Sequence, residues 1–383
     1  MMVYFQFFLI LVFLFLIFSY KDFVLKVLLI IFWSPLLPLF AYSIDVPLVG
    51  AFGISKFDNE VSQYALNLCL IGNTIFYALL WKIRNVRFKY VSVKIRKQHR
   101  YILFLLLLLS SIPILNTHTE NGGSKSATFF IVFNTILLVS TKKKDIVWYG
   151  QLIVLLFLIA TGERVDGILF LLCMFIIKDD RSINSKELRK LYMVLPIALA
   201  LLVYIGATRG GGSFSIDVLT KSLYSQQTIT DVAYVYTTGV DYYLNNGSNT
   251  SVLLNLFGGL FPGPTGGIPS IYNYRNILND YMPNAGGGLF YTEGMLAFGG
   301  LGVCLYIAIF AIAIRKLYVG GKRWKSALFL LLFCMACRII WYGLIYSYKP
   351  IILFLLSLFA IETMQRKRNI KLQQYGEKYN NSK

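Results

Sequence analysis

Long runs of apolar residues, each separated from the next by a short polar or charged stretch, recur from the first residue to about position 361. A helix needs roughly twenty predominantly apolar residues to cross a bilayer, and helices satisfy their own backbone hydrogen bonds there. The pattern therefore predicts an all-α polytopic membrane protein with about eleven transmembrane helices, within a range of roughly 10–12. The predicted helices cover about residues 1–19, 23–40, 64–81, 101–115, 126–141, 146–160, 163–177, 191–207, 289–314, 326–346 and 349–362.

The composition of the 383 residues supports a membrane protein. Hydrophobic residues make up 57% and charged residues 14%, and the mean hydropathy is +0.62. Soluble domains carry about a quarter charged residues, so the length of this chain does not indicate several soluble domains. The first apolar run has no basic segment before it and no small-residue cleavage site before Lys21. We interpret it as a retained helix and not as a signal peptide.

The basic residues are distributed unevenly between the predicted loops. Of the 37 Lys and Arg residues, 29 fall in segments that alternate with the remaining 8. The richer set lies at Lys21 and Lys26 and in residues 82–100, 142–144, 178–190, 315–325 and 366–383. The positive-inside rule assigns this set to the cytoplasm, which places the N-terminus outside and the C-terminal tail inside. The net charge of +19 therefore reflects topology and contact with membrane lipids, and no nucleic-acid partner is expected.

Four parts follow from this topology: N-terminal transmembrane helices in 1–207, a large periplasmic loop in 208–288, C-terminal transmembrane helices in 289–362 and a basic cytoplasmic tail in 363–383. A loop of this length without structure of its own is unusual unless it is functional. The loop is rich in Tyr, Asn and Gly. Such a composition suits a sugar-binding surface, and it is also typical of a tyrosine belt at the membrane interface.

The cysteine and histidine residues give little sign of metal or redox chemistry. All five cysteines lie in apolar runs, a single CxxC spacing occurs at Cys334 and Cys337, and the chain has two histidines. A metal site would require a second CxxC or a histidine cluster. We therefore expect no disulfide, no metal and no cofactor.

Four arginines are predicted to lie at a similar depth near the outer interface: Arg164, Arg209, Arg275 and Arg338. Arg338 lies about 20 Å along its helix from Lys325, with apolar residues on both sides. Insertion of an arginine at such a depth costs a few kcal/mol, and such residues usually face a polar cavity or a partner. Snorkelling to the surface is the alternative for Arg338, and a local salt-bridged turn is the alternative for Arg164. Glu293, which begins the ninth predicted helix on the same side, is a candidate partner for Arg338 or a candidate general base.

Arginine binds phosphate through a planar fork of donors and keeps its charge in most surroundings. Arg209 is followed by Gly210, Gly211 and Gly212, which allow backbone N–H groups to approach the same anion closely. The four arginines and three glycines therefore predict a phosphate-binding site at the outer membrane interface.

Three local patterns resemble the O-antigen polymerase (Wzy) family of bacterial inner membranes. "ATGERVDGILFLL" is similar to the Thr-Gly-x-Arg of that family and corresponds to Arg164. "GGGLFYTEGMLAFGGLG" is similar to the Gly-rich start of the helix after the large loop, with Glu293 and a later Phe298-Gly299. Arg275 and Gly286 are separated by ten residues, as in the Arg-x10-Gly spacing of some members. Related ligases usually place a histidine in the large loop, and this loop has none.

The resemblance implies a metal-independent glycosyltransferase that joins undecaprenyl-diphosphate-linked oligosaccharides at the periplasmic face, with a chain-length regulator protein as a further partner. The leaving group would be a diphosphate, whose developing charge preorganised arginines can stabilise. Glu293 or an acidic residue of the loop would act as the base. Another polyprenyl-linked membrane glycosyltransferase or an O-antigen ligase is the nearest alternative. A flippase for lipid-linked oligosaccharides is a more distant alternative, because it would not need the tyrosine-rich loop.

Overall fold

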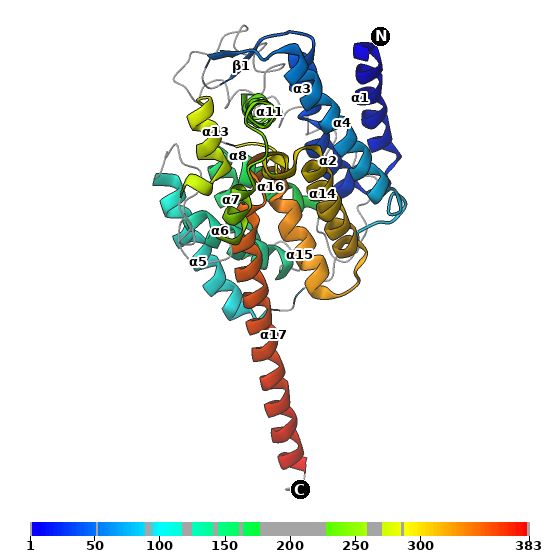
Figure 1. Cartoon of the computed structure of the whole chain (residues 1–383). Helices are drawn as coiled ribbons and strands as arrows, with labels where there is room; N and C mark the ends of the chain where they lie inside the picture. Colours follow the sequence, from blue (N-terminus) through cyan, green and yellow to red (C-terminus); the bar gives the residue numbers. More distant parts are fainter. Residues whose placement is uncertain are drawn as a thin grey trace.

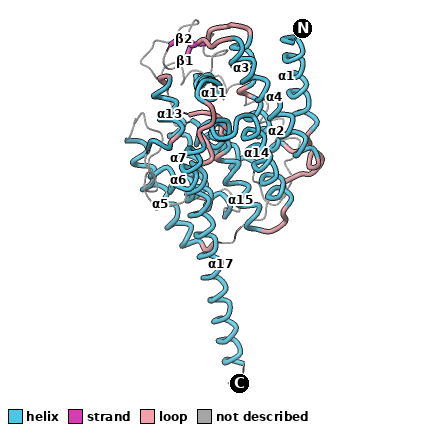
Figure 2. Tube along the Cα trace, viewed as in Figure 1, coloured by secondary structure: helices cyan, strands magenta, loops and turns pink. Residues whose placement is uncertain are grey.

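The computed structural model describes residues 2–50, 53–88, 93, 95–116, 125–140, 145–160, 164–176, 227–258, 270–284 and 287–380. Helices form nearly all of the regular structure in these ranges (Figure 2). Two three-residue strands, β1 (Leu48–Gly50) and β2 (Gly53–Ser55), form a small antiparallel hairpin. The predicted helical class is confirmed for the described part of the chain.

The helices of the N-terminal part follow the predicted apolar runs. Asp22 defines the start of α2, because its Oδ1 accepts a hydrogen bond from the Val24 N–H at 2.8 Å, as a helix N-cap does. Pro35 follows the end of α2 and separates it from α3. The helices here are α1 (Met2–Ser19), α2 (Phe23–Trp33), α3 (Leu36–Ser43), α4 (Asn59–Trp81), α5 (Lys97–Asn116), α6 (Lys125–Ser140), α7 (Ile146–Ala160) and α8 (Arg164–Ile176).

The remaining described helices occupy the predicted loop and the C-terminal part. Within the predicted loop they are α11 (Gln227–Asn246), the short 3-10 helix η1 (Thr250–Val252), α12 (Leu253–Gly258), a second 3-10 helix η2 (Ser270–Tyr272) and α13 (Tyr274–Tyr281). After it come α14 (Thr292–Val319), α15 (Arg323–Cys334), α16 (Ala336–Tyr342) and α17 (Ile345–Asn380).

Five helical segments in the described part are long and apolar enough to cross a membrane. They are Met2–Ser19, Phe23–Ser43, Asn59–Trp81, Thr292–Val319 and Ile345–Met364. The pair α15 and α16 is a sixth such segment if its 57° bend lies within one span. The predicted helix 191–207 lies outside the described residues. The protein therefore has the helices of a membrane protein, and the total of eleven spans stays a prediction.

The predicted cytoplasmic segments meet at one end of the helical bundle. The Lys21 N–H donates to the Arg84 carbonyl at 2.8 Å, and the Tyr318 hydroxyl donates to the Val86 carbonyl at 2.9 Å. The N-terminus lies at the opposite end from the C-terminus, which the long helix α17 carries away from the rest of the molecule (Figure 1). This arrangement agrees with an N-terminus and a C-terminus on opposite sides of the bilayer.

Helix α11 lies inside the molecule and not on a free surface. Figure 1 shows it end-on, so it runs across the direction of α17. It packs on α14, α4 and α13, and its Val235, Tyr236 and Val240 are fully buried. Part of the tyrosine-rich segment therefore contributes to the core, whereas Tyr281 is exposed, and the expected tyrosine surface stays a prediction. Tyr236, Tyr274 and Tyr291 all retain 2% or less of their exposed area.

Candidate functional site

The structure describes the side chains of three predicted site residues: Arg275, Arg338 and Glu293. Arg164 is the first residue of α8, but its side chain is not among those described. Arg209 and the glycines Gly210, Gly211 and Gly212 lie outside the described residues. The site can therefore be built from α13, α14, α16 and α17.

Arg275 lies in the first turn of helix α13 and connects it to the corner between α16 and α17. Its Nη1 donates to the Tyr346 hydroxyl, its Nη2 donates to the Tyr342 carbonyl and its Nε lies 3.5 Å from the Tyr274 hydroxyl. The guanidinium carbon lies 4.6 Å from the centroid of the Tyr346 ring, within the range of a cation–π contact. These three hydrogen-bond partners of the guanidinium are neutral oxygen atoms.

Tyr274, the residue before Arg275, contacts the same corner. Its hydroxyl is buried and donates to the Gly287 carbonyl at 2.9 Å. Burial raises its pKa to about 12, although the charge of Arg275 acts to lower it, so the phenol keeps its proton at neutral pH. Gly288 has a φ of 116°, and a Cβ there would lie 3.2 Å from the Tyr274 oxygen. A glycine is therefore required where the chain passes over Tyr274.

Arg338 lies on α16, directly after the bend that separates α16 from α15. Its guanidinium carbon lies 5.8 Å from the centroid of the Tyr346 ring, the same ring that Arg275 contacts. The two guanidinium groups are thus separated by no more than the sum of their distances to that centroid. Like charges this close repel each other, so the surroundings favour an anion between or beside them. We call Tyr274, Arg275, Arg338, Tyr342 and Tyr346 the tyrosine–arginine cluster.

Glu293 lies in the first turn of α14 and is 1% exposed. The Asn255 amide donates to its Oε1 at 3.4 Å, and within the described ranges Oε2 has no hydrogen-bond partner. Burial lowers the pKa of Arg275, but the neighbouring tyrosines and Glu293 outweigh that effect and raise it. Glu293 therefore interacts electrostatically with Arg275 of the tyrosine–arginine cluster, and its second oxygen is buried without a hydrogen-bond partner in the described part of the chain.

Helix α14 is broken six residues after Glu293. Gly299 has a φ of 61° and a ψ of −144°, a backbone conformation that residues with a Cβ rarely adopt. The first turn folds back so closely that a Cβ on Gly302 would collide with the Gly294 carbonyl. The Phe290 N–H donates to the Ile340 carbonyl at 3.1 Å, which ties the segment before Glu293 to the helix of Arg338. Two interrupted helices, α14 and the α15–α16 pair, therefore meet at the site, and interrupted helices recur at substrate sites in membrane proteins.

Arg275 and Arg338 lie near one another, since both contact Tyr346, and the common depth of the four arginines and their role in binding a phosphate stay predictions. Three contributors were missed: Tyr274, Tyr346 and Asn255. Tyr346 ends the apolar run that predicts the helix over 326–346, and Tyr274 belongs to a loop with many tyrosines. A weak signal was the run of tyrosines at 342, 346 and 348 around the glycine at 343.

A hollow of about 470 Å³ lies elsewhere, beside α3, β2 and the start of α4. Its Lys56 pairs with Asp45 at 3.0 Å, and both side chains are exposed. It contains none of the predicted site residues. The hollow is lined by Ser43, Ile44, Asp45, Lys56, Phe57, Asp58 and Asn59.

Within the described ranges, no group of three or more His, Cys, Asp or Glu side chains is arranged to hold a metal ion. All five cysteines are free thiols. Comparison of the chain with family models, with curated proteins and with solved structures finds no match. The function is therefore argued from the site itself.

Proposed function

We propose that the protein is an O-antigen polymerase, a glycosyltransferase that joins undecaprenyl-diphosphate-linked oligosaccharide repeat units at the periplasmic face of the bacterial inner membrane. The observation that carries the proposal is the pairing of Arg275 and Arg338 on the Tyr346 ring, at 4.6 and 5.8 Å. Two cations on one ring, at the meeting point of two interrupted helices, suit a ligand that combines a diphosphate with a lipid chain.

The transfer breaks the bond between the anomeric carbon of the donor glycan and its diphosphate oxygen. The diphosphate leaves with the electron pair of that bond, so negative charge develops on its oxygens. Arg338 and Arg275 supply fixed positive charge in a half-buried position, where electrostatic stabilisation is stronger than in water. Arg164 and Arg209 are proposed to complete the grip on the diphosphate, with the N–H groups of Gly210, Gly211 and Gly212.

The new glycosidic bond forms between the anomeric carbon and a hydroxyl oxygen of the acceptor repeat. The hydroxyl proton must pass to a base within hydrogen-bond reach. Glu293 suits this role, since Asn255 holds one carboxylate oxygen while the other oxygen has no hydrogen-bond partner in the described part. The chemistry needs no metal ion, and a chain-length regulator protein remains a proposed partner.

Another transferase that uses a polyprenyl-linked sugar, or an O-antigen ligase, would need the same arginines and a base. A flippase would need the arginines but no base. The buried Glu293 therefore favours a transferase, and the absence of a histidine in residues 208–288 favours polymerisation over ligation.

Deletion of the gene in the source strain tests this proposal through the surface lipopolysaccharide. We expect lipid A–core that carries at most one repeat unit, because ligation survives the loss of polymerisation. Gel analysis measures the distribution of lengths, and complementation with the wild-type chain is the control. Loss of even the single repeat would indicate a ligase or a flippase, and an unchanged ladder would refute a role in this assembly.

A further inference from the structure

The tyrosine–arginine cluster depends on one aromatic side chain, Tyr346. It lies on the first turn of α17 and is half-buried. Its hydroxyl accepts from Arg275, and its ring lies near both guanidinium groups. Tyr346 is thus the common contact of two arginines that come from different helices, α13 and α16.

We propose that Tyr346 is a positioning residue of the diphosphate site, which holds Arg275 and Arg338 together so that both cations act on one anion. This inference rests on the proposed function above. Two guanidinium groups repel each other, and without a common contact this repulsion would drive the long side chains apart. The electron-rich faces of an aromatic ring attract each cation, so the ring offsets part of that repulsion.

The ring and the hydroxyl of Tyr346 have separable roles. Arg275 donates a hydrogen bond from its Nη1 to the hydroxyl and also contacts the ring. Arg338 contacts the ring, at 5.8 Å. Tyr346→Phe therefore removes the hydroxyl contact with Arg275 alone, whereas Tyr346→Leu removes the ring contact of both arginines.

The remaining contacts of Arg275 explain why loss of Tyr346 need not unfold the corner. Its Nη2 still donates to the Tyr342 carbonyl, and its Nε still lies beside the Tyr274 hydroxyl. Tyr274 in turn stays bonded to Gly287. Helix α13 therefore keeps an anchor, and the expected defect lies in the placement of charge.

The test is titration of the purified full-length protein in lipid nanodiscs with farnesyl diphosphate, a short polyprenyl diphosphate. Farnesol, which lacks the diphosphate, is titrated in parallel. We expect Tyr346→Leu to weaken diphosphate binding about tenfold, as loss of a partly desolvated cation–π contact would. Tyr346→Phe should weaken it about threefold, as loss of one hydrogen bond would. Neither variant should change the binding of farnesol.

Tyr281→Leu is the matched control, since Tyr281 lies at the other end of α13 and bonds to Asp241 at 3.0 Å. It should bind farnesyl diphosphate like the wild type. With lipid-linked repeat units as substrate, Tyr346→Leu should lower kcat/KM about tenfold or more, because the two arginines that the ring positions act on the diphosphate both when it binds and when it leaves.

Each outcome separates the two proposals. A wild-type protein that binds farnesyl diphosphate no better than farnesol would refute the diphosphate site itself. If the wild type prefers the diphosphate and Tyr346→Leu binds it with the same affinity as the wild type, the role of Tyr346 is refuted. If Tyr346→Leu does not fold, Tyr346→Phe decides the question, and wild-type affinity for the diphosphate in that variant would refute the role.

Discussion

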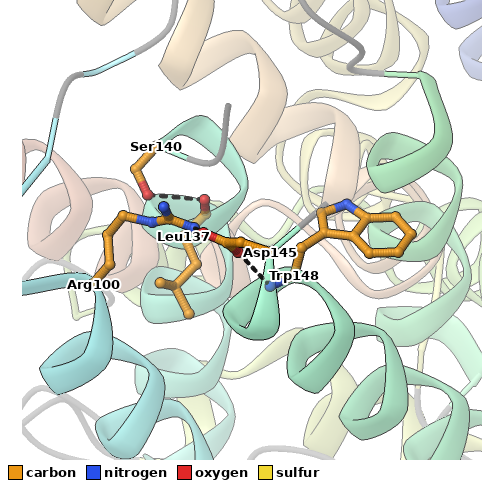
Figure 3. A network of polar contacts seen from close by, with 5 residues as sticks. All are labelled: Arg100, Leu137, Ser140, Asp145 and Trp148. Atoms are coloured by element: carbon orange, nitrogen blue, oxygen red, sulfur yellow. Dashed lines mark hydrogen bonds and ion pairs between the residues drawn. The ribbon is translucent and has the colours of Figure 1, made fainter. Parts of the chain in front are cut away.

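Two arginines in this protein, Arg100 and Arg275, are bound in different ways. Arg100, at the end where the predicted cytoplasmic segments meet, pairs with Asp145 at 2.6 Å (Figure 3). Asp145 also accepts a hydrogen bond from the Trp148 N–H at 3.0 Å, so it closes the start of α7 as well. Arg275 instead donates to a tyrosine hydroxyl and a carbonyl oxygen.

The difference concerns where the positive charge is balanced. At the Arg100 junction the carboxylate lies on the guanidinium itself, so little charge is left for a ligand. In the tyrosine–arginine cluster Arg275 donates to the neutral Tyr346 hydroxyl and Tyr342 carbonyl, and Arg338 adds a second cation beside the Tyr346 ring. Arg100 is thus paired with a carboxylate, while Arg275 and Arg338 place two cations beside one aromatic ring, an arrangement that suits an anionic ligand.

The largest expected effect comes from Glu293, because it is the proposed base and one of its carboxylate oxygens has no hydrogen-bond partner in the described part of the chain. Glu293→Gln keeps an oxygen for the Asn255 amide but removes the base. We expect polymerisation by the purified protein to fall by a factor of about 10² or more, with an unchanged melting temperature. The measurement is the length of product formed from lipid-linked repeat units.

Asp145→Asn is the matched carboxylate control for Glu293→Gln. Its carboxylate already binds Arg100, so this change should lower stability and leave the activity of the folded protein intact. Comparable activity in Glu293→Gln and the wild type would remove Glu293 from the role of base.

The sequence was sufficient to place the apolar helices of the described part, since long apolar runs can satisfy their backbone groups in a membrane only as helices. It was not sufficient to show where these helices break. The range predicted as one helix over 326–346 contains a 57° bend, and the range over 289–314 contains the break at Gly299. Glycines in an apolar run are visible in the sequence, but the packing of Gly294 on Gly302 that fixes this break is a tertiary contact.

The sequence likewise indicated some residues of the candidate site and not others. Arg338 and Glu293 could be singled out because charge in an apolar run is costly, and Arg275 because of its spacing to Gly286. Tyr346 and Tyr274 could not, because tyrosine is common both in cores and at membrane interfaces. The buried helix α11 was missed for a related reason: it is less apolar than a membrane span, and it lies in a segment with many turn residues.

A smaller effect is expected at Arg338, where the geometry of the charge can be separated from the charge itself. Arg338→Lys keeps the cation and loses the planar fork that grips two phosphate oxygens. We expect KM for the lipid-linked donor to rise about tenfold in Arg338→Lys, and polymer to be lost in Arg338→Ala. Protein level in the membrane is measured together with polymer length, so that instability is recognised.

Arg84→Lys is the matched control, since Arg84 lies 4.4 Å from the Trp81 ring at the other end of the bundle. Polymer length should not change in this variant. Full activity of Arg338→Lys would mean that Arg338 acts only as a topological charge and would weaken the contrast between the two regions.

The smallest effect, a change in stability alone, is expected at the Arg100 junction. The side chains of Arg100 and Asp145 are 12% and 39% exposed, so their pairing lies between a surface ion pair and a buried one. Surface pairs contribute about 0–1 kcal/mol, and breaking a buried pair costs about 3–5 kcal/mol. We therefore expect a coupling energy of roughly 1–2 kcal/mol for Arg100 and Asp145.

A double-mutant cycle with Arg100→Ala and Asp145→Ala isolates that coupling, because Asp145→Ala alone also removes the hydrogen bond to Trp148. Stability is measured by equilibrium unfolding in mixed detergent micelles, and activity is measured per folded protein. We expect Arg100→Ala to lower the stability of the protein without weakening the binding of farnesyl diphosphate, since Asp145 balances the charge of Arg100. A loss of diphosphate binding equal to that of Arg338→Ala would mean that the two regions are coupled, and the division between structural and ligand-directed arginines would fail.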